Sequence, residues 1–215
     1  MKFSPTIAFT ALLVAALPSF AVPVTLTFEG ATSFSPIANF YSGGGGTNYH
    51  LAFSAPAVAL VNDGTGPGPS GEFFSNAPSP GTVMFAPDAP AFVSVTDGLR
   101  LLNQISFYYS SLEASASAVQ IYSGLNGSGT VLASANLLAN SQSGCAPAPY
   151  CHWDKLTLNF SGIARSVGFS NIGFAAFDDI ALNVVPEPTT ALLAMVGVVG
   201  LFASSRRKVS RVESL

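Results

Sequence analysis

The sequence has few charged residues and very few basic ones. Only 9% of its 215 residues are charged, whereas ordinary soluble domains contain about a quarter. Between Val22 and Val185 there are nine acidic residues and three basic ones, which gives this region a net charge of −6; the basic residues are Arg100, Lys155 and Arg165. Phosphate binding requires clustered Lys and Arg, so nucleic acid is excluded as a partner. The surface is expected to be polar and uncharged.

The sequence between the termini also lacks any stretch with a helical period over three turns, and no repeat of fixed period is found. Short segments alternate between apolar and polar residues and end at Gly, Pro, Asn or Asp, as in Val24 to Gly30. Such segments are typical of strands. They are expected at 24–29, 82–86, 92–96, 101–110, 119–121, 131–134, 155–160, 165–170, 172–177 and 178–184, with 82–86 and 92–96 following one another in a meander. Residues 48–54 have a strand-like pattern, and 56–61 is a short apolar run that ends at Asn-Asp-Gly. The pattern predicts an all-β, jelly-roll-like β-sandwich over residues 22–184.

The first 21 residues have the layout of a secretory signal peptide. Lys2 precedes a short apolar run from Ile7 to Leu17, and small residues, Ser19 and Ala21, stand at positions −3 and −1 from a cut before Val22. The run is too short to span a bilayer well. Residues 1–21 are therefore predicted to be removed on export.

Cysteine is almost absent, since Cys145 and Cys151 are the only two. In an oxidising compartment they are expected to form one local disulfide. The alternative is that Cys151 and His152 form a nucleophile pair. This is disfavoured because the two residues are adjacent in the chain and no acid stands nearby to orient the histidine. The two histidines, His50 and His152, lack the spacing of a zinc site.

Four consecutive glycines, Gly43 to Gly46, follow Asn39-Phe40-Tyr41-Ser42. A glycine-rich stretch suggests a phosphate cradle, but no Lys-Ser/Thr follows and no helix opens after it. A mobile surface loop is the expected structure.

Three acidic residues stand near the two ends of the domain: Glu29 after the first predicted strand, and Asp178 and Asp179 at the start of the last one. Asp178 shares alternation with Ile180, Leu182 and Val184, so we expect it to point inward, where an uncompensated carboxylate is costly. A structural Ca²⁺ ion would satisfy the three acids. The alternative is that they accept backbone hydrogen bonds, as acidic residues in turns do.

The Phe-Glu and Asp-Asp-Ile sequences at these positions are also similar to those of extracellular jelly rolls such as MAM domains and galactose-binding-like carbohydrate modules. The resemblance covers two short motifs. It implies a structural metal between the first and last strands.

Catalytic patterns are scarce. Glu72 and Glu113 are the candidates for a pair of glycosidase carboxyls, and no Gly-x-Ser-x-Gly elbow is present. Aromatic side chains with polar groups stack on sugar rings as they do on other apolar surfaces; they are Tyr41, Tyr49, Tyr108, Tyr122, Tyr150 and Trp153. We expect most of them to lie at core edges, so polysaccharide binding is permitted by the sequence and not required by it.

The C-terminal tail, residues 185–215, differs from everything before it. Pro186-Glu187-Pro188 precedes an apolar segment at 189–205, and the basic cluster Arg206, Arg207 and Lys208 follows within the tail 206–215. The two prolines bar a helix interior at the motif. The apolar segment is just long enough for a single membrane helix, and the basic cluster predicts a cytoplasmic C-terminus.

This tail closely resembles the PEP-CTERM sorting signal of exopolysaccharide-producing Gram-negative bacteria. Motif, span and basic cluster occur in the required order, although Val209 to Leu215 extend beyond the usual end. The upstream domain is similar to cargo of the same family at Phe28-Glu29-Gly30, at 39–46, at 122–129 and at Phe177-Asp178-Asp179-Ile180. The resemblance implies an inner-membrane-anchored precursor cut by an exosortase near Pro186-Glu187-Pro188.

Together these features predict an exported, non-enzymatic protein of the cell envelope or extracellular matrix. It is expected to be structural or adhesive, with exosortase as its processing partner and exopolysaccharide as a possible ligand. Two alternatives are a secreted polysaccharide hydrolase and a membrane-anchored protein-interaction module that keeps its tail.

Overall fold

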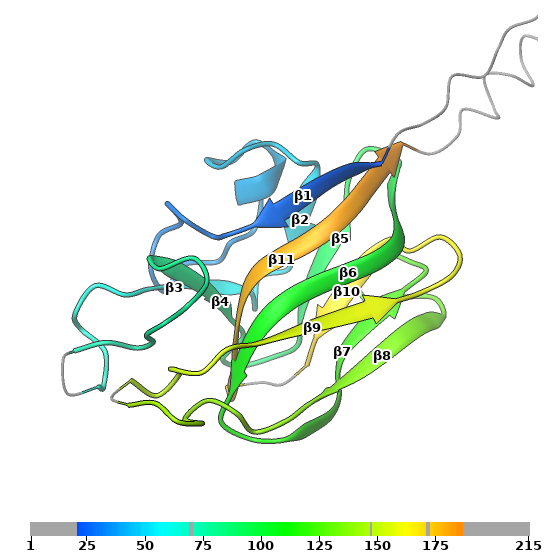
Figure 1. Ribbon diagram of the computed structural model, residues 1–215. Coiled ribbons are helices and arrows are strands. Elements are labelled where there is room, and N and C mark those ends of the chain that lie inside the picture. Colours follow the sequence, from blue (N-terminus) through cyan, green and yellow to red (C-terminus); the bar gives the residue numbers. More distant parts are fainter. Residues whose placement is uncertain (1–20, 69–70, 147, 171–172, 187–215) are drawn as a thin grey trace, which may run out of the picture.

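A computed structural model describes residues 21–68, 71–146, 148–170 and 173–186. These residues form two antiparallel sheets packed face to face, as the sequence predicts (Figure 1). The only helix among them is a single turn of 3₁₀ helix, η1 (Phe40–Ser42). The predicted signal peptide, apart from Ala21, the predicted membrane helix at 189–205 and the basic cluster lie outside the described residues. None of the helical structure within the described part has the length and apolar character to cross a bilayer.

The larger sheet has the strand order β3-β4-β11-β6-β9, and β1 pairs with β11 beside this path. Its strands are β1 (Val22–Leu26), β3 (Val58–Val61), β4 (Thr82–Phe85), β6 (Leu99–Ser111), β9 (Asp154–Asn159) and β11 (Ala175–Pro186). The first and last strands of the domain are therefore neighbours. Val22 lies opposite Val184 in the register of this pair.

The smaller sheet has the order β2-β5-β10-β7-β8. Its strands are β2 (Leu51–Phe53), β5 (Ala91–Val95), β7 (Ser115–Tyr122), β8 (Val131–Leu137) and β10 (Ser166–Phe169). The Asn-Gly step at 126–127 predicts a tight turn. β7 and β8 form an antiparallel hairpin around it, with Asn126 and Gly127 both at positive φ. The predicted meander is wrong, because β4 and β5 lie in different sheets. Pro87 and Pro90 stand in the connection that carries the chain from one sheet to the other.

The core lies between the two sheets and is rich in phenylalanine. Phe107 of β6, Phe169 of β10 and Phe177 of β11 form a cluster with ring centroids 4.8–6.1 Å apart in edge-on geometry. All three side chains are fully buried, and burying each contributes about 1.5–3 kcal/mol. A smaller cluster under the loops contains Phe74 and Tyr150, with Trp153 packed against it.

Strand β11 is one strand interrupted by a bulge, whereas the sequence predicts two strands at 172–177 and 178–184. The register against β6 shifts between Asp178 and Ala181, and Asp179 has a φ of 47°. Phe177 and Ile180 consequently both belong to the main core. The predicted alternation of Asp178 with Ile180 is therefore broken at the bulge, although Asp178 is fully buried as predicted.

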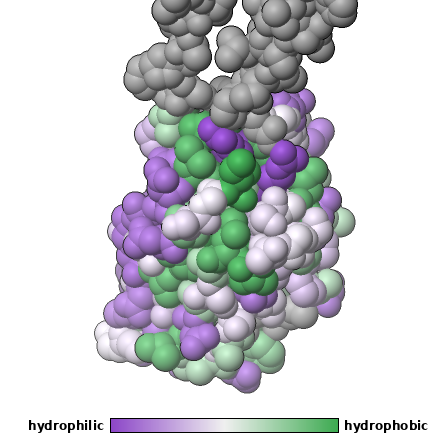
Figure 2. All heavy atoms as spheres, turned by 90° about the vertical axis from the view of Figure 1, so that its right-hand side faces the viewer, coloured by the Kyte–Doolittle hydropathy of each residue, from purple (hydrophilic) through white to green (hydrophobic). Residues whose placement is uncertain are grey.

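The first strand is shorter than predicted. It ends at Leu26, and Phe28 has a φ of 63°, which turns the chain out of the sheet before Glu29. The predicted disulfide between Cys145 and Cys151 is confirmed. It closes a short loop beside the smaller hydrophobic cluster. The surface is a mixture of polar and apolar residues, in line with the low charge (Figure 2).

Candidate functional site

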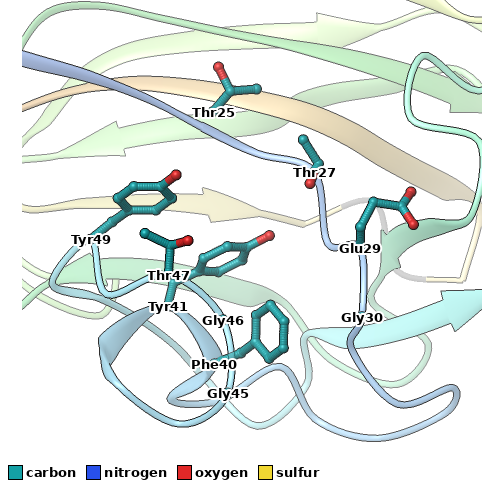
Figure 3. Close-up of a pocket in the computed structure, with 10 residues that line it drawn as sticks. All are labelled: Thr25, Thr27, Glu29, Gly30, Phe40, Tyr41, Gly45, Gly46, Thr47 and Tyr49. Carbon is teal, nitrogen blue, oxygen red and sulfur yellow. The ribbon is translucent and has the colours of Figure 1, made fainter.

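An open pocket of about 510 Å³ lies between the end of β1 and residues 40–49, and we call it the Tyr49 pocket (Figure 3). One side is formed by the first strand and the residues after it. The other side is formed by η1 and the glycine loop. Its lining residues are Thr25, Thr27, Glu29, Gly30, Phe40, Tyr41, Gly45, Gly46, Thr47 and Tyr49.

The alternation of β1 places hydroxyl groups on the pocket side. Val24, Leu26 and Phe28 are buried in the core, so the intervening threonines face outward because successive side chains of a strand point to opposite sides. Thr25 is exposed and Thr27 is half-buried. A third threonine, Thr47, lies in the facing loop.

Tyr41 fixes the back of the pocket. Its Oη accepts a hydrogen bond of 2.7 Å from the backbone N–H of Phe28, the residue at positive φ. Burial raises the pKa of Tyr41 to about 12, so its hydroxyl is neutral at physiological pH. The Tyr41 ring stacks on Tyr49, with centroids 6.0 Å apart and an interplanar angle of 18°. Tyr49 is half-buried and presents part of its ring to the pocket.

The glycine run forms a surface loop, as predicted, and backbone hydrogen bonds define its conformation; its mobility stays a prediction. The N–H of Gly44 donates to the carbonyl of Asn39, and the N–H of Gly46 donates to the carbonyl of Phe40. A Cβ at Gly46 would overlap the Phe40 ring. Gly45 and Gly46 therefore allow the close approach of this loop to Phe40.

Glu29 lies at the rim and connects the pocket to the β3–β4 connection. Its Oε1 accepts hydrogen bonds from the N–H groups of Gly81 at 2.9 Å and Thr82 at 3.0 Å. Its side chain extends away from Tyr41 and Tyr49 (Figure 3). Glu29 thus binds the segment 79–82 through its Oε1 atom.

Asp178 and Asp179 bind the same segment. Oδ2 of Asp178 accepts the Ser79 N–H at 2.7 Å, and Oδ1 of Asp179 accepts the Ser79 hydroxyl at 2.7 Å. Oδ1 of Asp178 also accepts the N–H of Asp179. Burial raises the pKa of Asp178 to about 7 against the opposing effect of these hydrogen bonds. The three acids predicted as metal ligands are therefore all attached to residues 79–82.

The hydrogen bonds are those expected if the acids act as turn residues. Within the described ranges, no group of three or more His, Cys, Asp or Glu side chains has the arrangement of a metal site. The oxygens of Asp178 both accept N–H groups. A calcium ion at Glu29, Asp178 and Asp179 remains a prediction.

The other predicted residues lie apart from the Tyr49 pocket. His152 contacts Asp154 at 3.1 Å, and the indole of Trp153 donates to the carbonyl of Ser75, so both belong to the surroundings of the disulfide loop. Glu72 and Glu113 do not line the pocket. Sequence reasoning missed the threonines of the pocket. The alternation Thr25-Leu26-Thr27 could have identified them, because it places both threonines on the face opposite the core.

Pro186 is the last residue of β11 and pairs with Leu99 of β6. The remaining predicted sorting residues, Glu187, Pro188, Arg206, Arg207 and Lys208, lie outside the described part. A family model described as the PEP-CTERM protein-sorting motif matches residues 184–208. The chain carries a PEP-CTERM protein-sorting motif. This motif marks an exported protein that an exosortase processes at the membrane, and here it begins within strand β11.

Several solved structures are similar to this chain at low identity. The K2 cleaved adhesin domain of Lys-gingipain is 14% identical, with a TM-score of 0.47, over 75% of this chain and 99% of that one. A family 6 carbohydrate-binding module from Clostridium stercorarium, in complex with cellobiose, is 11% identical, with a TM-score of 0.40, over 74% and 92%. The C-terminal family 6 module of a laminarinase from Zobellia galactanivorans is 11% identical, with a TM-score of 0.39, over 75% and 99%. No curated protein matches the sequence.

Proposed function

We propose that this protein is a non-enzymatic, structural or adhesive component of the cell envelope or extracellular matrix, and that it binds polysaccharide at the Tyr49 pocket. Its precursor is anchored in the inner membrane by residues 189–205 until exosortase processing. The observation that carries the binding proposal is the composition of the pocket. Threonine hydroxyls line one side and the Tyr49 ring lies on the other.

Both parts of this lining suit a sugar. Hydroxyl groups donate and accept hydrogen bonds, as sugar hydroxyls do. A flat aromatic face packs against the apolar face of a sugar ring. Ligand sites generally combine such aromatic area with a few polar groups that fix orientation. No basic residue is among the lining residues, so the proposed ligand is a glycan without an anionic group at this position.

Affinity electrophoresis tests the proposal. The exported protein is run in native gels cast with neutral, amino-substituted or uronic polysaccharides, and retardation is compared between the wild type and the variants Tyr49→Ala and Thr27→Val. Retardation by a neutral polysaccharide is expected, with a loss of at least about tenfold in affinity for Tyr49→Ala, equivalent to about 1.4 kcal/mol. Thr130→Val is the matched control, because Thr130 is exposed in the β7–β8 turn, far along the chain from the pocket.

Three outcomes would contradict the proposal. Absence of retardation in every gel removes polysaccharide binding. If Tyr49→Ala is retarded as much as the wild type, and thermal melting shows that both proteins are folded, the polysaccharide binds elsewhere than in this pocket. Release of reducing ends from the retarding polymer would make the protein a hydrolase. Mass spectrometry of the mature C-terminus separately tests the exosortase step, since an intact Leu215 in cells that contain an exosortase would contradict it.

A further inference from the structure

A second hollow, of about 180 Å³, lies on the outer face of the larger sheet. Its walls come from three adjacent strands, β1, β11 and β6. It is lined by Pro23, Val24, Thr25, Gln104, Ser106, Ala181, Leu182 and Asn183. Thr25 lines this hollow and the Tyr49 pocket alike. The two hollows are therefore adjacent, and together we call them the sheet groove.

The strand register shows how the floor of the groove continues. Thr25 lies opposite Ala181, Ala181 lies opposite Ser106, and Ser106 lies opposite Thr157 of β9. These four small side chains cross four neighbouring strands, which are spaced about 4.8 Å apart, so the row is about 14 Å long. The row and the Tyr49 pocket together are longer than a single sugar ring.

Polar side chains flank the floor. Asn183 lies opposite Pro23, and Gln104 lies opposite Asn159. Within the described part of the chain, the side chains of Thr25, Gln104, Ser106 and Asn183 make no hydrogen bond to other protein groups. Their amide and hydroxyl groups are therefore available to a ligand. On the other flank, Tyr108 carries the Lys155 ammonium 5.5 Å from its ring centroid.

The chemistry of this surface favours a carbohydrate over a protein partner. Protein interfaces are centred on buried aromatic, Met and Arg anchors, and the second hollow contains none of these. It contains hydroxyls, amides and small apolar patches, and no acidic or basic side chain lines it. A neutral polymer with many hydroxyls suits such a surface.

We infer that the sheet groove binds an extended, unbranched segment of a neutral polysaccharide, which passes from the Tyr49 pocket across Thr25 and over β11 and β6. The inference rests on the proposed function and goes beyond it. It makes the ligand an internal stretch of polymer and not a terminal sugar. Binding strength should therefore increase with chain length beyond the units held by the Tyr49 pocket.

Chain-length dependence tests this inference. The exported protein is screened in native gels containing hydroxyethylcellulose, laminarin or galactomannan. Oligosaccharides of increasing length are then prepared from the polymer that retards it, and their affinities are measured by isothermal titration calorimetry. Affinity should rise at least about tenfold between the trisaccharide and the hexasaccharide.

Ser106→Tyr would fill the second hollow and leave the Tyr49 pocket unchanged. We expect this variant to lose the rise with chain length and to keep the wild-type affinity for the trisaccharide within about twofold. Ser134→Tyr is the matched control, because Ser134 is exposed on β8 of the other sheet. If Ser106→Tyr unfolds, the double variant Gln104→Ala and Asn183→Ala removes the polar flank without adding bulk.

Each result decides the inference. If wild-type affinity stops rising at the trisaccharide, or if folded Ser106→Tyr binds the hexasaccharide as the wild type does, the second hollow is not part of the site, and the proposed function still stands. If no polymer retards the wild type, polysaccharide binding and this inference fail together.

Discussion

The buried carboxylate of Asp178 accepts a hydrogen bond from the backbone N–H of Ser79, a residue 99 positions earlier in the chain, with 2.7 Å between Oδ2 and N. With Glu29 and Asp179, this contact attaches the connection between β3 and β4 to the first and last strands of the larger sheet. The Asp178–Ser79 contact is therefore a link between distant parts of the chain, and its strength depends on the protonation of one buried group.

Stability is expected to depend on pH through Asp178. The folded-state pKa of about 7 lies above the ordinary value of 3.8, so the folded protein holds a proton that the unfolded chain releases. The stabilisation is complete below pH of about 4 and is lost as pH rises to about 7, with an upper limit of about 4 kcal/mol. In chelator-containing buffer, urea unfolding of the wild type should show this decline relative to Asp178→Asn. Parallel pH profiles for the two proteins would contradict it.

Calcium is expected to raise the melting temperature if Glu29, Asp178 and Asp179 bind it, since a ligand that binds only the folded state stabilises it. The melting midpoint is measured with excess calcium and again after chelation. The variant Asp179→Asn is predicted to reduce the difference. Identical midpoints in the two buffers would remove the calcium site and leave the hydrogen bonds to residues 79–82 as the complete role of these acids.

Tyr41→Phe should destabilise the domain by about 1–3 kcal/mol, because the variant leaves the N–H of Phe28 buried without its acceptor. Urea denaturation measures the loss. Tyr49→Phe is the control: Tyr49 stacks on Tyr41 but contributes no hydroxyl hydrogen bond among the described residues. Equal effects of the two substitutions would mean that the hydrogen bond to Phe28 contributes little.

Replacing Cys145 and Cys151 together by Ser should lower the free energy of unfolding by about 2 kcal/mol, the value for a loop as short as this one. The nearby indole of Trp153 allows the change to be followed by fluorescence. Reduction of the wild type should produce the same loss. A much larger loss would show that the disulfide does more than restrict the unfolded chain.

The fold could be predicted from the sequence where alternation is regular. The period of two at Val24, Leu26 and Phe28 identifies β1 and its buried face, and the Asn-Gly step at 126–127 identifies the β7–β8 turn. Alternation does not show which sheet a strand joins. For this reason the sequence predicts β4 and β5 as neighbours, although they lie in different sheets.

The bulge at Asp179 could not be predicted in the same way. A bulge inserts one residue into a strand and changes which side chains face the core, and aspartate tolerates the positive φ that it requires. The sequence therefore indicates that Asp178 is buried but assigns it to the same face as Ile180. The Tyr49 pocket depends on contacts between β1 and residues 40–49, which no local pattern records.

The pairing of Val22 with Val184 determines how the domain responds to mechanical force. The two ends of the folded chain lie at the same end of two antiparallel neighbours, so a pull between them opens the β1–β11 pair one residue pair at a time. A pull along β11 alone has a different effect, because β6 holds this strand along most of its length and β1 and β4 lie on its other side. That load shears many backbone hydrogen bonds together. A load taken up along β11 therefore meets more resistance than a load applied between the two ends of the domain.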